Sequence, residues 1–283
     1  MIAPIRCLPR QPQCLLAFSG PDATRYLNGQ LTQDVRDLGD RSLASCVTDA
    51  KGRLQAFVHL CRGADDAIWI NGPADRAEEL EARLTRYLIA DDVDVTDLSD
   101  QWQLIHVVDS IEPPPEFPGS IIRRSERSGP DGWDLWLPQK TALPELHPLS
   151  HAEAETRRIM ARIPAWGAEL TAGMLPPEAA LDRNAISYHK GCYIGQEVLS
   201  RIKSAGRLNR KLTAFLVDSD AAAGDLLGNL EASRPAGSLT SVAPWPNESG
   251  THAALGYLDK SAFDAVELPL VGKSGRARVI GFV

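Results

Sequence analysis

Residues 190–197 read KGCYIGQE, and this octapeptide is the most informative stretch of the 283-residue chain. It follows residues 185–188, whose apolar and aromatic side chains predict a short strand, and it leads into residues 196–202, whose pattern predicts a helix. Cys192 is then expected just before a helix N-terminus with Lys190 nearby, and both features favour a thiolate. The octapeptide therefore makes Cys192 a candidate reactive thiol and Lys190 the candidate group that lowers its pKa.

The same residues also have structural interpretations. Free cysteine is among the most frequently buried residue types, so Cys192 also fits a small buried position. Gln196 and Glu197 fall in the first turn of the predicted helix, where a carboxylate suits the helix dipole. Glu197 stands four positions before Arg201, which is the spacing of an ordinary surface ion pair. These residues alone leave both interpretations open.

The composition bounds the class of protein. The five cysteines are scattered and form no CxxC pair, which argues against a disulfide framework and a metal site and favours a reducing compartment. Charged residues make up 24% of the chain, close to the average for folded domains. No run of about 20 apolar residues occurs, so we expect a soluble cytoplasmic protein without a membrane span.

The net charge of −7 is unevenly distributed along the chain. Residues 190–211 carry +5, and the remaining 24 basic and 36 acidic residues carry −12. We call the six cations of this window the basic strip: Lys190, Arg201, Lys203, Arg207, Arg210 and Lys211. Such a strip can attract an anionic partner such as RNA, and a solvated helix face explains it equally well.

Hydrophobic periodicity predicts the elements of the N-terminal half. Within residues 53–109 the order of strand, strand, helix, strand, strand predicts a small α+β layer. The expected elements are strands at 14–18, 54–60, 67–70, 93–96 and 103–108 and helices at 21–29 and 74–88. The proline-rich residues 112–116 predict an extended linker after this layer.

The C-terminal half has different signals. Ser150 and Glu153 form a capping box, which predicts a helix from residue 151 to about residue 161. A strand is expected at 134–137. From residue 211 onward, five short strands separated by Gly and Pro predict a small barrel or sandwich.

Several blocks in the same order resemble the YgfZ-type folate-binding proteins, which are relatives of the glycine-cleavage aminomethyltransferase. The octapeptide resembles their KGCYxGQE signature, and it is the most specific of the blocks. The other matching blocks are 20–34 (GPDA through NGQLTQD), 49–53 (DAKGR), 175–179 (LPPEA) and 201–210. Ordinary turn chemistry also explains 28–34 and 49–53.

The resemblance implies an α+β fold built as a three-part ring around a folate-binding hole. Its parts are a split folate-binding domain (residues 1–50 and 117–208), a ferredoxin-like insertion (51–112) and a C-terminal β-barrel (209–283). The strand-strand-helix-strand-strand unit fits the insertion, and the all-β tail fits the barrel.

The resemblance also implies a tetrahydrofolate-binding accessory protein for iron–sulfur enzymes and tRNA modification, rather than a classical enzyme. Cys192 and Lys190 would carry the chemistry, and the expected folate-binding residues are Arg158, Tyr193, Gln196 and Glu197. The alternatives are an aminomethyltransferase that passes a one-carbon unit to tetrahydrofolate, and a ligand-free module that binds RNA or an acidic protein through the basic strip.

Two positions depart from the pattern of the family. Arg162 stands where its R-I-x-A-G-I-P segment usually has glycine. Met160 stands where the aminomethyltransferases commonly have a glutamate that contacts folate, and this argues against the transferase alternative.

Overall fold

The structure is a computed structural model that describes residues 4–228, 234–244 and 250–283, and it consists of two compact units. Unit 1 comprises Met1–Ser150 and Leu181–Ser200, and unit 2 comprises His151–Ala180 and Arg201–Val283. The helix α4 (Gln196–Ala205) contains the third crossing of the chain between the units.

Unit 1 is built on one ten-stranded sheet in the order β10-β1-β7-β9-β8-β3-β4-β5-β2-β6. The pairs β1–β10 and β3–β8 are parallel, and the other pairs are antiparallel. Its elements are β1 (Ile5–Cys7), β2 (Gln13–Ser19), α1 (Ala23–Gln30), β3 (Arg41–Thr48), β4 (Leu54–Arg62), β5 (Ile68–Pro73), α2 (Ala77–Thr85), β6 (Asp94–Asp97), β7 (Trp102–Val107), β8 (Ile121–Ser125), β9 (Trp133–Pro138) and β10 (Leu146–Pro148).

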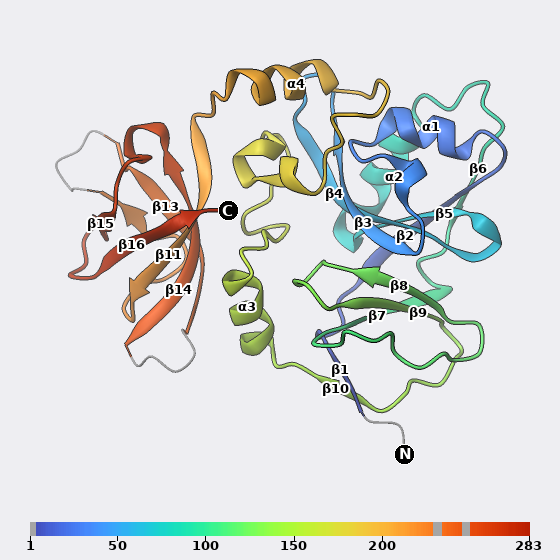
Figure 1. Cartoon of the computed structure of the whole chain (residues 1–283), viewed down its shortest axis with the longest axis horizontal. Coiled ribbons are helices and arrows are strands. Elements are labelled where there is room, and N and C mark those ends of the chain that lie inside the picture. The colour runs from blue at the N-terminus through green and yellow to red at the C-terminus, as the bar shows by residue number, and fades with distance from the viewer. Residues whose placement is uncertain (1–3, 229–233, 245–249) are drawn as a thin grey trace. The chain divides into compact units, whose positions relative to one another are not determined.

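Several apolar cores hold this sheet, and two of them involve its largest buried side chains. The helices α1 and α2 lie on the same face of β2, β4 and β5 (Figure 1), where Leu27 and Leu84 are completely buried. A second core forms around Trp69, whose ring lies 4.6 Å from that of Trp102 and 5.6 Å from that of Trp136 between centroids. Trp102 and Trp136 belong to β7 and β9, so this aromatic cluster packs the two halves of the sheet together.

A buried polar network also crosses unit 1. The carboxylate of Asp134 is fully buried and lies 2.7 Å from Arg127 Nη2 and 2.7 Å from His106 Nδ1. The other ring nitrogen of His106 lies 2.7 Å from the Ser128 hydroxyl. Burial opposes ionisation of Asp134, but Arg127 and His106 outweigh it and hold the pKa of this carboxyl far below its usual range. The network therefore fixes the β8–β9 turn to the interior of the sheet.

The predicted strands and helix of residues 54–108 are confirmed as β4, β5, α2, β6 and β7. They do not form a sheet of their own, because β5 and β6 both pair with β2, and β7 pairs with β9. The proline-rich residues 112–116 consequently connect strands of one sheet. The predicted strand at 185–188 is wrong: in place of a ladder, Ala185 N–H donates to the Leu181 carbonyl and Ser187 N–H donates to the Thr32 carbonyl.

Unit 2 contains a six-stranded sheet in the order β12-β13-β14-β11-β16-β15. Its elements are α3 (His151–Met160), β11 (Arg210–Asp218), β12 (Leu226–Leu227), β13 (Gly237–Pro244), β14 (Thr251–Asp259), β15 (Glu267–Pro269) and β16 (Arg276–Phe282). An antiparallel bridge from Leu227 to Leu270 joins the two edges of the sheet. The predicted C-terminal barrel is therefore confirmed, with Phe215 and Ala277 completely buried in its core.

The α+β class is confirmed, whereas the ring arrangement and the predicted limits of the three domains stay predictions. Within the described residues, no helix is long and apolar enough to span a membrane.

Candidate functional site

The loop that leads into the octapeptide is held by the polar stretch 28–34. The Thr32 hydroxyl donates to the Ala185 carbonyl over 2.6 Å, and the Ser187 N–H donates to the Thr32 carbonyl over 2.9 Å. The Gln33 amide donates to the Asn184 carbonyl over 2.9 Å. The polar side chains of this stretch are therefore used inside the protein, to fix a segment about 150 residues away in sequence.

Lys190 is buried and points at the same stretch. Its ammonium group donates to the carbonyls of Leu31 and Gln33 over 2.8 and 2.7 Å, and it lies 5.3 Å from the ring centroid of Tyr193. Burial lowers the pKa of Lys190 to about 7. Lys190 thus anchors the loop, and its predicted effect on the pKa of Cys192 stays a prediction.

The other end of the octapeptide docks on the turn at residues 49–53. The Thr48 hydroxyl donates to the Ile194 carbonyl over 2.6 Å. Gly195 has φ +90°, and a Cβ there would lie 2.7 Å from the Asp49 carbonyl oxygen and 2.9 Å from Gly52 Cα. Glycine is required at position 195 because the backbone of one motif lies directly against the backbone of the other.

Cys192 projects from this anchored loop and is exposed. The other four cysteines are at most 3% exposed: Cys7, Cys14, Cys46 and Cys61. Burial raises the pKa of Cys46 and Cys61 to about 12, so these thiols are poor nucleophiles. The alternative interpretation of Cys192 as a small buried residue is wrong. The helix α4 begins at Gln196, so the thiol precedes the first turn rather than capping it.

The remaining octapeptide residues occupy distinct places. Gln196 is half-buried and Glu197 is exposed in the first turn of α4. Tyr193 is 7% exposed, and its hydroxyl has no hydrogen-bond partner among the residues that the structure describes. A buried hydroxyl without a partner costs free energy, so this atom is a candidate contact for a polar ligand.

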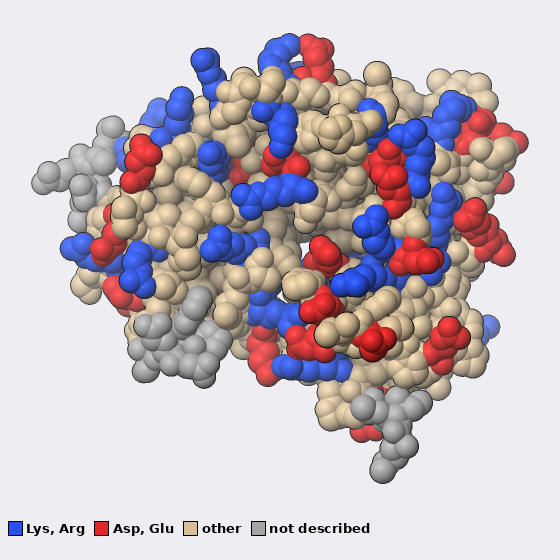
Figure 2. All heavy atoms as spheres, viewed as in Figure 1, with Lys and Arg blue, Asp and Glu red and all other residues tan. Residues whose placement is uncertain are grey.

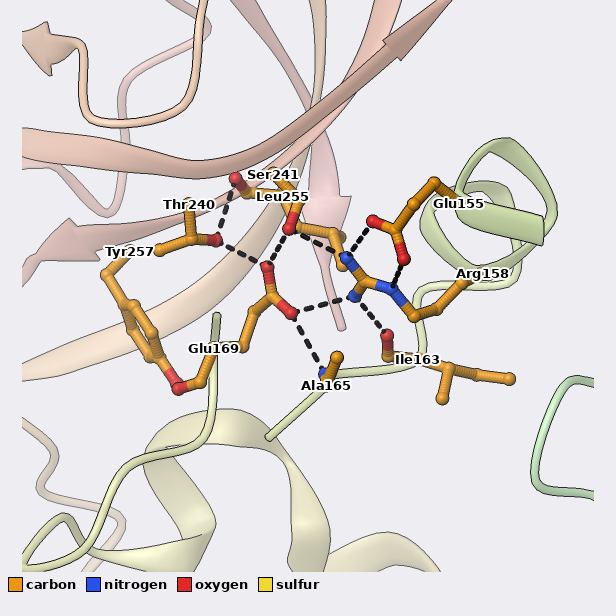
Figure 3. A network of polar contacts seen from close by, with 9 residues as sticks. All are labelled: Glu155, Arg158, Ile163, Ala165, Glu169, Thr240, Ser241, Leu255 and Tyr257. Carbon is orange, nitrogen blue, oxygen red and sulfur yellow. Dashed lines mark hydrogen bonds and ion pairs between the residues drawn. The ribbon is translucent and has the colours of Figure 1, made fainter. Parts of the chain in front are cut away.

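Arg158 belongs to unit 2, where it forms the centre of a polar network (Figure 3). Its Nη1 donates to Glu169 over 2.7 Å and to the Ile163 carbonyl over 2.8 Å. Its Nη2 donates to Ser241 over 2.7 Å and to Glu155 over 2.8 Å, and its Nε donates to Glu155 over 3.0 Å. All five N–H donors of the guanidinium are therefore engaged. The predicted folate contact of Arg158 stays a prediction, and it would have to compete with these bonds.

Glu169 lies at the centre of this network beside Arg158, and no sequence motif indicated it. Its carboxylate is fully buried, and it accepts from Arg158, from Ala165 N–H and from the hydroxyls of Thr240 and Ser241 over 2.6–2.9 Å. Its carbonyl also accepts from the Tyr257 hydroxyl over 2.9 Å. Glu169 therefore ties the segment after α3 to strands β13 and β14 (Figure 3).

Comparison with known proteins supports the resemblance drawn from the motifs. A tRNA-modifying protein YgfZ of Cronobacter sakazakii is 26% identical over 236 residues, which cover 74% of this chain and 70% of that protein. The predicted resemblance to the YgfZ-type proteins is thereby confirmed. A mitochondrial iron–sulfur cluster assembly factor IBA57 homolog of Chaetomium globosum is also 26% identical over 239 residues, covering 73% of this chain and 55% of that protein. No protein-family model matches.

The fold of the chain is that of an aminomethyltransferase. The crystal structure of the glycine cleavage system aminomethyltransferase T from Bartonella henselae superposes with a TM-score of 0.80. The alignment covers 98% of this chain and 85% of the other at 20% sequence identity, which establishes the fold alone. The predicted fold class is thereby confirmed.

Arg162, which departs from the R-I-x-A-G-I-P pattern, occupies a strained backbone position. The helix α3 ends in a Schellman motif, in which Ile163 N–H donates to the Arg158 carbonyl and Arg162 N–H to the Ile159 carbonyl, each over 3.0 Å. Arg162 is the residue after the cap and has φ +58°, a left-handed conformation that favours glycine. Its side chain retains one long hydrogen bond, of 3.3 Å, to the Phe282 carbonyl.

We expect Arg162→Gly to be more stable than Arg162→Ala by about 1 kcal/mol in free energy of unfolding, because alanine retains the left-handed strain and glycine does not. Both variants lose the contact with Phe282, so their difference isolates the backbone contribution. Urea unfolding of the two variants measures it. Equal stabilities would show that the helix end relaxes to another conformation.

The basic strip is less available than its sequence suggests. Lys190 is buried, Arg210 forms an ion pair with Glu178 at 2.9 Å, and Lys211 lies within 5 Å of two phenylalanine ring centroids. On the face shown in Figure 2, an acidic group lies beside the Lys and Arg side chains of the upper edge, where Figure 1 places α4. An RNA contact through this strip stays a prediction, and it would rest on the exposed Arg201, Lys203 and Arg207.

Proposed function

We propose that this protein is a cytoplasmic tetrahydrofolate-binding accessory protein that supports iron–sulfur enzymes and tRNA modification, with Cys192 as its reactive thiol. The observation that carries the proposal is the exposed thiol of Cys192 on a loop anchored at Lys190 and at Gly195, in a chain whose other cysteines are buried. The names of the YgfZ and IBA57 relatives support the type of client enzyme.

The residues near the thiol suit a polar ligand to different degrees. The buried Tyr193 hydroxyl lacks a partner among the described residues, so a heteroatom of the folate would satisfy it. Gln196 and Glu197 begin α4 and offer amide and carboxylate groups at its first turn. Arg158 fits less well because its donors are already engaged. We therefore assign the principal folate contact to Tyr193 rather than to Arg158.

Titration calorimetry tests the ligand. We expect saturable heat with tetrahydrofolate, and about fivefold weaker binding for Tyr193→Phe, because one hydrogen bond contributes about 1 kcal/mol. Tyr26→Phe is the matched control, since that buried hydroxyl already donates to the Leu84 carbonyl. No saturable heat up to millimolar tetrahydrofolate would reject the folate part of the proposal, and unchanged affinity in Tyr193→Phe would reject the assigned contact.

Complementation tests the thiol. In a bacterial strain that lacks its own YgfZ-type protein, we expect the wild-type chain to restore iron–sulfur enzyme activity and Cys192→Ala to fail. Cys7→Ala is the control, because that cysteine is buried and removing its sulfur changes packing alone. Full complementation by Cys192→Ala would remove the thiol from the proposal.

The alternative function is an aminomethyltransferase, which the fold favours. Met160, at the position where the family comparison expects glutamate, is 44% exposed and supplies no acid. Incubation with tetrahydrofolate and an aminomethyl donor distinguishes the two functions. Formation of methylene-tetrahydrofolate would support the transferase.

A further inference from the structure

The surroundings of Lys190 offer two hydrogen-bond acceptors, whereas its ammonium group carries three N–H donors. The carbonyls of Leu31 and Gln33 lie 2.8 and 2.7 Å from Nζ, and no third acceptor within hydrogen-bond distance is found among the described residues. A neutral amine has two N–H groups and matches these two carbonyls. The extra donor of the ammonium form meets only the ring of Tyr193, whose centroid is 5.3 Å from Nζ.

The charged groups around Lys190 compensate little for its burial. Asp34 favours the ammonium form, but its carboxylate already accepts from Arg36 Nε over 2.9 Å and from Arg36 Nη2 over 2.5 Å. Arg36 itself disfavours a second cation beside it. Together with the Tyr193 ring, these are the titratable and charged groups that face Lys190. The geometry therefore favours the neutral amine more than water does.

We propose that Lys190 is a proton-linked clamp, which holds the Cys192 loop closed more firmly as a neutral amine than as an ammonium group. The proposal deepens the proposed function, since it assigns the positioning and regulation of the loop that carries the thiol. In this role Lys190 affects the thiol by holding the Cys192 loop in position, rather than by placing a positive charge beside Cys192.

The direction of the pH effect follows from the protons bound in each state. In the closed loop burial lowers the pKa of Lys190 to about 7, whereas in an open loop the amine returns to water and to a pKa of about 10.4. Between these values the closed loop binds fewer protons, so raising the pH favours closure. Below pH 7 both states are protonated, and the equilibrium no longer changes with pH.

Hydrogen exchange of the Ile194 amide, which donates to the Gly29 carbonyl over 3.2 Å, reports opening of the loop. After correction for intrinsic exchange, we expect the open population to fall about 20-fold from pH 6.5 to 8.5. In Lys190→Met the change should be less than about twofold, because no proton is linked to opening. The exposed Lys51 in the adjoining turn is the matched control, and Lys51→Met should keep the full change. The Ser125 amide, in the sheet of unit 1, reports global opening.

The proposal would be overturned if the open population of the wild type did not change with pH, or if Lys190→Met showed the same change with pH as the wild type. Should Lys190→Met fail to fold, carbon NMR titration of Lys190 in the wild type decides, with a midpoint near 7 expected and one above about 9 contradicting the proposal. The measurements need neither folate nor a client enzyme. A failure of the proposed function therefore leaves their result unchanged, and a failure of the clamp leaves folate binding and complementation unchanged.

Discussion

Glu169→Gln is expected to lower the free energy of unfolding by about 3 kcal/mol, because it breaks a buried ion pair and inverts one set of hydrogen bonds. One carboxylate oxygen of Glu169 accepts from Arg158 and Ala165, and the other accepts from Thr240 and Ser241. A glutamine amide places an N–H donor against one of these pairs of donors. The carboxamide also leaves the buried guanidinium without its fully buried counter-ion.

Glu155→Gln is the matched control for this prediction. Glu155 pairs with the same guanidinium at 2.8 Å, but its side chain is 52% exposed, so water replaces the lost charge. We expect it to cost less than about 1 kcal/mol. Urea unfolding followed by circular dichroism compares both variants with the wild type. Equal losses would mean that burial of Glu169 does not set the strength of the pair.

Much of the secondary structure was predictable because its signals are local. Alternating apolar residues indicate β4, and its side chains are alternately buried and half-buried along most of the strand. The segment 185–188 also has apolar and aromatic side chains but is not a strand, since Thr32 bonds to the Ala185 carbonyl and the Ser187 N–H. The apolar composition indicates burial for both β4 and residues 185–188. Only β4 has neighbouring strands to pair with, and the composition does not reveal this.

The candidate site was predictable in its residues and less so in their roles. Lys190 stands two positions from Cys192 in sequence, yet its Nζ bonds to carbonyls of residues 31 and 33, which sequence proximity does not indicate. Glu169 belongs to no recognisable sequence motif, and its partners in β13 lie more than 70 residues away in sequence. Long-range contacts of this kind depend on tertiary structure and leave no local pattern.

The two glycines of the octapeptide provide the sharpest test of how the site is built. Gly195→Ala is expected to cost about 3 kcal/mol of unfolding free energy, which combines left-handed strain with a clash against backbone. A Cβ at this position would meet the Asp49 carbonyl oxygen at 2.7 Å and the Thr48 hydroxyl at 2.8 Å. Asp49 is part of a tight turn and cannot move as a flexible side chain would. The loop must therefore separate from this turn, so the amide of Ile194 should lose its protection from hydrogen exchange.

Gly191→Ala is the control within the same motif, because a Cβ at Gly191 has no atom within 4 Å. We expect its unfolding free energy to stay within about 0.5 kcal/mol of the wild type and the Ile194 amide to stay protected. Urea unfolding and hydrogen exchange on both variants measure the two effects. If both glycines tolerate alanine, the contact between residues 190–197 and 49–53 does not hold the loop, and the exposure of Cys192 must depend on the Lys190 side alone. If only Gly195 fails, the thiol is presented by two independent anchors, one ionisable and one steric.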